Sequence, residues 1–342
     1  MVTFSHFYSQ MNESNSETEM GNTLKTQFVL SKIKYEVISE TDKTVKIVRN
    51  EDVDYFGNIV IPLTVHFITD FKVVEIEERA FEGCDKITSI QFPDTITIIG
   101  KCAFRTCSAL TSLELPKNLE TIETGAFDHC KAVRSIKFPQ GLISIDNLAF
   151  SYCLKLSNIT LPSSLRSLGN YAFWHCCELT HVEIQGYQEF YLGKNIFSES
   201  GLKSIAFPRN IAIIGEYMFA GTSFEKIKLP DTVVIIKGHA FWSCRNLESV
   251  YLPDSVERID DSAFSCCTNL REIRLSNSMV EIPAFMCESC CLIEYIDIPY
   301  SVKHISGGAF LNCKNLKKVR IPYETIFEED RVFEKGVQIV RY

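Results

Sequence analysis

The chain has 342 residues, of which 46% are hydrophobic and 23% are charged, and its formal net charge is −8. Such a length and composition allow a large buried core and exclude global disorder. The acidic balance gives no clustered cations for phosphate groups, so we expect no nucleic-acid partner.

The N-terminal segment is polar. Residues 1–27 are rich in Ser, Asn and Glu, and we expect a flexible tail there. The segment has no basic start, apolar run or small-residue cleavage site, so it is not a secretory leader as given. No stretch approaches the roughly 20 apolar residues that span a bilayer. Localisation stays open between a cytoplasmic protein and one whose leader has been removed.

Residues 28–58 are predicted to form an N-terminal β cap. Within them "KYEVISETDKTVKIVRN" (34–50) indicates two strands around a polar turn. A hairpin of this kind would shield the end of whatever follows from edge-to-edge association.

From residue 59 to residue 342 the chain is periodic. One position recurs every 23 residues, with one interval of 24 and two of 22 where a residue is gained or lost, and it is almost always Phe. This anchor position holds Phe81, Phe104, Phe127, Phe150, Phe173, Phe197, Phe219, Phe241, Phe264, Cys287, Phe310 and Phe333.

Each repeat predicts one coil of a solenoid. Segments such as "SLEL", "NITL" and "YIDI" alternate apolar with polar residues, which is the pattern of a half-buried strand. The Pro after most of them ends the strand, and a second short extended piece follows. About eleven coils stacked roughly 4.8 Å apart would bury the apolar columns in a β-rich rod on the order of 50 Å long.

The repeat I-x-x-x-A-F-x-x-C-x-x-L-x-x-I-x-L-P-x-x-L-x-x-I resembles the BspA-like leucine-rich repeat family over roughly residues 59–342. This resemblance implies a non-enzymatic recognition scaffold. It also implies adhesion to host or matrix proteins at a cell surface, or secretion.

Cysteines fill a column three residues after the anchor. Nine of its eleven positions are Cys and the other two are Ser200 and Thr222, so a small side chain at a tight inward turn satisfies all of them. We expect reduced, buried thiols, because stacked Cβ atoms near 4.8 Å exceed the usual disulfide separation. The ladder comprises Cys84, Cys107, Cys130, Cys153, Cys176, Cys244, Cys267, Cys290 and Cys313.

The sequence offers little for metal or catalytic chemistry. "CESCC" (287–291) contains one C-x-x-C, but no second ligand pair lies nearby in register. His129 and His175 share a column two coils apart, with Tyr152 between them. No Ser-His-Asp arrangement, G-x-G-x-x-G or P-loop occurs, so we expect no enzyme, no metal and no cofactor.

The strand positions that point outward are the best candidates for binding. They are mostly small hydroxyl residues in the N-terminal half and become charged and aromatic from Lys226 onward. Tyr and Arg are enriched at interface hot spots. The predicted protein-binding residues are Lys228, Tyr251, Arg274, Tyr295 and Arg320. The alternative is ordinary charge pairing between neighbouring strands.

The segment "QGYQEFYLG" (185–193) is the second candidate. It gains one residue, loses the Pro and carries Tyr187, Phe190 and Tyr191 beside Trp174, which lies one turn back. Exposed aromatic rings here could stack on a sugar, which makes carbohydrate binding the alternative function. Local repacking without any function is the other interpretation.

Overall fold

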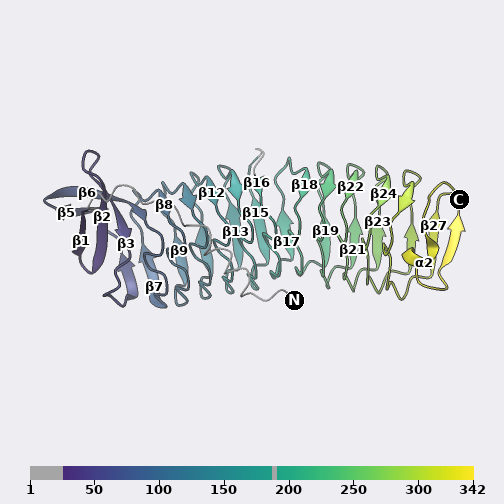
Figure 1. Cartoon of the computed structure of the whole chain (residues 1–342), viewed down its shortest axis with the longest axis horizontal. Coiled ribbons are helices and arrows are strands. Elements are labelled where there is room, and N and C mark those ends of the chain that lie inside the picture. The colour runs from purple at the N-terminus through teal and green to yellow at the C-terminus, as the bar shows by residue number, and fades with distance from the viewer. Residues whose placement is uncertain (1–25, 187–190) are drawn as a thin grey trace, which may run out of the picture.

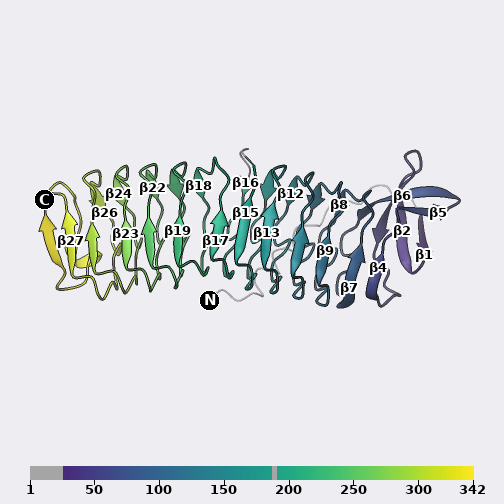
Figure 2. The same cartoon turned by 180° about the vertical axis from the view of Figure 1, so that it is seen from behind.

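The computed structural model describes residues 26–186 and 191–342, and these form a rod of stacked coils with a cap of antiparallel strands at the N-terminal end (Figure 1). Seen from behind, the same succession of coils runs without interruption from the cap to the C-terminal strand (Figure 2). The predicted solenoid of about eleven 23-residue coils is therefore confirmed.

The cap contains the hairpin that residues 34–50 predict. β1 (Gln27–Leu30), β2 (Ile33–Ser39) and β3 (Thr44–Val48) pair in antiparallel order, and β3 then pairs in parallel with β6 (Thr69–Ile76). β5 (Thr64–Phe67) pairs antiparallel with β6, and β4 (Phe56–Val60) pairs with β7 (Lys86–Gln91). Tyr35 and Ile47 are buried and cover the end of the apolar stack.

We call the first face of the rod the strand face. It carries the longer strand of each coil, and its outward side chains alternate with buried ones. After β7, its strands are β9 (Ser112–Glu114), β11 (Ser135–Lys137), β13 (Asn158–Leu161), β15 (His181–Ile184), β17 (Ser204–Ala206), β19 (Lys226–Lys228), β21 (Ser249–Tyr251), β23 (Glu272–Arg274), β25 (Tyr295–Asp297), β27 (Lys318–Ile321) and β28 (Gln338–Arg341).

The second face, the short-strand face, carries the two-residue strand of each coil. Its strands are β8 (Ile98–Ile99), β10 (Thr121–Ile122), β12 (Ser144–Ile145), β14 (Ser167–Leu168), β16 (Tyr191–Leu192), β18 (Ile213–Ile214), β20 (Ile235–Ile236), β22 (Arg258–Ile259), β24 (Glu281–Ile282) and β26 (His304–Ile305). Strand partners follow the period of the sequence, for example Ser144 with Ser167, and the longer interval appears as Ser167 with Tyr191.

The third face, the turn face, holds the anchor. Backbone N–H groups at alternate residues donate to carbonyls of the next coil, as Cys102, Phe104 and Thr106 do. Both residues two positions from the anchor adopt positive φ, as Cys102 and Thr106 do at 54° and 61°. The left-handed conformation is unfavourable for residues other than Gly, and the ladder to the next coil offsets that cost. The only helix of the described chain is α2 (Glu329–Val332), in the last coil.

Phenylalanine rings form the centre of the rod. Consecutive anchors stack with ring centroids between 5.1 and 6.0 Å apart, and all but the last are fully buried. Offset or parallel stacking at this spacing adds to the area that each ring buries. Cys287 interrupts the column between Phe264 and Phe310.

Candidate functional site

The cysteine ladder connects neighbouring coils through hydrogen bonds, which the sequence did not predict. Each buried thiol from Cys107 onward lies within hydrogen-bonding distance of the carbonyl of the anchor in the preceding coil, such as Cys130 Sγ and Phe104 O at 3.1 Å. The S–H group therefore donates across the coil boundary. Cys84 is only half-buried, since it belongs to the first full coil and has no earlier anchor to meet. The expectation of burial is wrong for that member.

All fourteen cysteines are free thiols in the structure. Burial raises the pKa of the ladder thiols, to about 12 for Cys313 and well above the ordinary value for Cys130. A protonated, buried thiol is a poor nucleophile and a poor metal ligand. Cys177 is the exposed exception.

The two histidines of the predicted column, His129 and His175, both stack on an aromatic ring. Tyr152 lies between the rings of His129, at 4.4 Å, and His175, at 4.7 Å. His129 Nδ1 is also 2.8 Å from the buried carboxylate of Asp128. In residues 26–186 and 191–342, no group of three or more His, Cys, Asp or Glu side chains could hold a metal ion.

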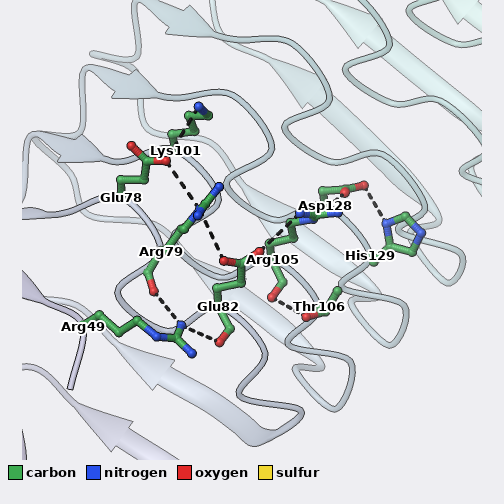
Figure 3. A network of polar contacts seen from close by, with 9 residues as sticks. All are labelled: Arg49, Glu78, Arg79, Glu82, Lys101, Arg105, Thr106, Asp128 and His129. Atoms are coloured by element: carbon green, nitrogen blue, oxygen red, sulfur yellow. Dashed lines mark hydrogen bonds and ion pairs between the residues drawn. The ribbon is translucent and has the colours of Figure 1, made fainter. Parts of the chain in front are cut away.

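A polar network extends from His129 toward the cap along the turn face (Figure 3). Arg105 connects Asp128, at 3.4 Å, to Glu82, at 3.3 Å. Arg49 donates to the Glu82 carbonyl at 2.9 Å, which ties the cap to the first coils. Every charge here has a partner, so the network stabilises the junction and leaves little for a ligand.

Trp174 belongs to this face as well. It packs edge-on against Tyr152 and Tyr171, with ring centroids 5.1 and 5.6 Å away. It is half-buried, and it does not line the groove on the short-strand face that Tyr191 borders. The structure therefore places Trp174 in an aromatic cluster of the turn face.

The five predicted protein-binding residues lie on the strand face. Lys228, Tyr251 and Arg274 are adjacent in one sheet and exposed. Tyr295 is 43% exposed on β25, and Arg320 is half-buried on β27 opposite Asp297. They form a line along the last coils.

Neighbouring side chains hold this line in place. The Tyr251 hydroxyl donates to Glu272 at 2.7 Å, and Arg320 pairs with Asp297 at 3.0 Å. Arg274 Nη2 lies 3.2 Å from both oxygens of Asp254, whose pKa is lowered first by hydrogen bonds from Asn277 and then by Arg274. The charge pairing considered as an alternative is thus present for both arginines, while the tyrosine rings remain open to solvent.

Two more tyrosines, which were not predicted as binding residues, lie beside this line. Tyr300 and Tyr323 are 68% and 76% exposed, and each directly follows the Pro that ends a strand. That column is polar in the earlier coils, so an aromatic residue there was a readable signal. Tyr342 packs on Tyr300 at 4.6 Å, and the Arg320 guanidinium lies over its ring at 4.2 Å. Four tyrosines, Tyr295, Tyr300, Tyr323 and Tyr342, therefore lie at the C-terminal end of the rod.

The second predicted site is the insertion at residues 185–193. Tyr187 and Phe190 lie outside the described residues. Tyr191 is 61% exposed on β16 and borders a groove of about 970 Å³ that follows the short-strand face from β16 to β24. Sequence analysis had named Tyr191 but not the groove.

The coil, its leucine-rich columns and its three faces define a leucine-rich repeat solenoid. The sequence model of the BspA type leucine rich repeat region matches residues 74–191, 122–248, 190–317 and 234–340. The chain belongs to this family, as its repeat predicted.

Solved structures agree on the fold. A leucine-rich repeat protein from Bacteroides ovatus shares 27% identity over 92% of this chain and 99% of that one, with a TM-score of 0.61. A leucine rich cell surface protein from Faecalibacterium prausnitzii shares 24% identity over 92% and 94%, with a TM-score of 0.55. The pneumococcal vaccine antigen PcpA shares 21% identity over 86% and 81%, with a TM-score of 0.58.

A comparison with curated proteins gives no match. Within residues 26–186 and 191–342, no helix has the length and apolar character needed to cross a membrane.

Proposed function

We propose that this chain is a non-enzymatic scaffold that recognises another protein through the C-terminal half of its strand face, from β19 to β27. The observation that carries the proposal is the line Tyr251, Arg274, Tyr295 and Arg320, in which aromatic rings are exposed and arginines are fixed. Rigid amphipathic rings and pre-positioned guanidinium groups lose little entropy on binding and are the residues most often found at hot spots.

Family membership supports the same class of function, and the family resemblance favours a host or matrix protein as the partner at a cell surface. The relative from Faecalibacterium prausnitzii is itself a cell surface protein, although at 24% identity it shares only the fold. In a solenoid the inward columns form the core, which leaves recognition to the outward positions.

Surface plasmon resonance against a panel of purified extracellular-matrix proteins tests the proposal. The double variant Tyr251→Ser, Tyr295→Ser should weaken binding by at least about tenfold, which corresponds to about 1.4 kcal/mol. Tyr191→Ser is the matched control, because it removes a ring that is still more exposed, from the short-strand face. Unchanged affinity in the double variant would remove this surface as the site.

Carbohydrate binding at the insertion is the second candidate. The exposed ring of Tyr191, beside a groove with many polar side chains, favours it. A glycan array should then give saturable binding that Tyr187→Ser and Tyr191→Ser both reduce.

A further inference from the structure

The groove that starts at Tyr191 exists because the short-strand ladder is interrupted. β14 pairs with β16 and β18 pairs with β20, but no described pairing joins β16 to β18. The gap falls at a step of 22 residues, from Tyr191 to Ile213, directly after the 24-residue step from Ser167 to Tyr191. The sheet reopens between β22 and β24 as well, so the groove spans a three-stranded segment with a gap at each side.

Glycines leave the floor of this groove bare. Gly193, Gly215 and Gly238 lie in it at positions where other coils carry longer side chains such as Glu123 or Asp261. None of the three has a positive φ, so their conformation does not itself demand Gly. Gly193 has no room for a side chain, whereas a Cβ on Gly238 would meet its nearest atom at 3.3 Å.

At the gap between β16 and β18, one backbone N–H group has no hydrogen-bond acceptor among the described residues. In the column of Gly215, the N–H group of the neighbouring coils donates to the preceding coil, as Gly193 does to Leu168 and Lys237 does to Ile214. Gly215 makes no such bond among the described residues, and Pro283 has no N–H to give. The Gly215 N–H and the Leu192 carbonyl can therefore bond a ligand that lies across the gap.

The charges of the walls indicate what kind of ligand fits. All three cations are paired, Lys194 with Glu216 at 2.6 Å and both Lys237 and Arg258 with Asp260 at 3.6 and 2.7 Å. No cation remains to attract an anionic ligand. The side-chain carboxylates of Glu257 and Asp261 are exposed, and within the described parts of the chain neither has a hydrogen-bond or ion-pair partner. Two free carboxylates accept hydrogen bonds well from hydroxyl groups.

We infer that this groove binds a neutral oligosaccharide chain. The exposed ring of Tyr191 stacks on one sugar, the bare floor admits the chain, and Glu257, Asp261 and the Gly215 N–H bond its hydroxyl groups. The groove crosses five coils, from β16 to β24. Four spacings between these coils place its ends roughly 19 Å apart, which is enough for a chain of several sugar rings. This inference rests on the second candidate function, carbohydrate binding, and moves its site from the insertion to the groove.

Titration calorimetry with cellohexaose, chitohexaose, mannohexaose and maltohexaose tests the inference, with a polygalacturonate oligomer and an uncharged ten-residue peptide as competing ligand classes. At least one neutral hexasaccharide should bind the wild-type chain. Gly238→Leu should fill the floor and weaken that binding by at least about tenfold. Gly307→Leu is the matched control, since Gly307 occupies the same column outside the groove and a Cβ there would meet nothing.

The exposed pair Glu257→Ala, Asp261→Ala provides a second variant that does not depend on filling the groove, and it should weaken binding as well. Circular dichroism of each variant checks that the coil has folded. If neither this pair nor Gly238→Leu changes the affinity while Tyr187→Ser does, the groove is wrong and carbohydrate binding at the insertion stands. If no neutral saccharide binds, or only the polyuronate or the peptide does, both fail.

Discussion

The inward columns of this rod and its outward strand positions obey opposite rules. Inside, Phe and Cys recur from coil to coil, because each ring stacks on the next and each thiol meets the preceding anchor carbonyl. Outside, the same strands carry Ser112 at one end of the rod and Tyr295 at the other without any change in backbone register. Stability is therefore concentrated in columns that cannot vary, and recognition is free to occupy columns that can.

The largest effect should come from breaking the ring column at its centre. Phe150→Ala removes a fully buried ring that stacks on Phe127 and Phe173 at 5.3 Å. We expect a loss of about 3–5 kcal/mol in the free energy of unfolding, measured by urea denaturation. A loss below about 1 kcal/mol would show that stacking between coils contributes little.

The next largest loss of stability should come from adding a side chain where two coils lie close together. A Cβ on Gly169 would lie 2.4 Å from the backbone nitrogen of Asn147, whereas one on Gly307 would meet nothing. Gly169→Ala should therefore cost about 1–3 kcal/mol of stability. Gly307→Ala should change the melting temperature little, and equal effects of the two variants would contradict this explanation.

The thiol ladder allows a test that separates size from hydrogen bonding. Cys176→Ala removes the donor to the Phe150 carbonyl and should cost about 1–2 kcal/mol. Cys176→Ser should be no better, because Ser200 fills the same column and its buried hydroxyl finds no hydrogen-bond partner among the residues that the structure describes. Thermal unfolding of both variants checks this order, and wild-type stability in the Ser variant would overturn it.

The smallest expected effect is a pH dependence at His239. Its ring stacks on Tyr217 at 4.4 Å, and burial lowers its pKa below the ordinary value. The folded state then binds a proton less readily than the unfolded state, so stability is complete above the unfolded pKa and falls on acidification below about 6.5. An NMR titration of the His239 ring should give a pKa below 6.5, and a higher value would contradict the burial argument.

The period of the sequence predicted the solenoid, the strand face and the position of the cysteine ladder, because each rests on a column of one residue type. It did not predict the left-handed turns, since residues as different as Thr106, His129 and Tyr152 adopt them without a glycine signature. It also missed the groove. That hollow runs across several coils, beside two breaks in strand pairing, and a single coil's sequence does not reveal it.

Replacing the outward residues on the strand face of the last coils tests most directly the claim that stability and recognition reside in different columns. Lys228→Thr, Tyr251→Thr, Arg274→Thr, Tyr295→Ser and Arg320→Thr together replace the charged and aromatic side chains of the last coils by small hydroxyl residues such as Thr160 and Ser112 of the earlier coils. The exposed pairs lost are worth about 0.2–1 kcal/mol each. We therefore expect a smaller loss of unfolding free energy than Phe150→Ala alone produces, together with loss of binding to matrix proteins. A loss of stability equal to or larger than that of Phe150→Ala would contradict the separation of stability from recognition.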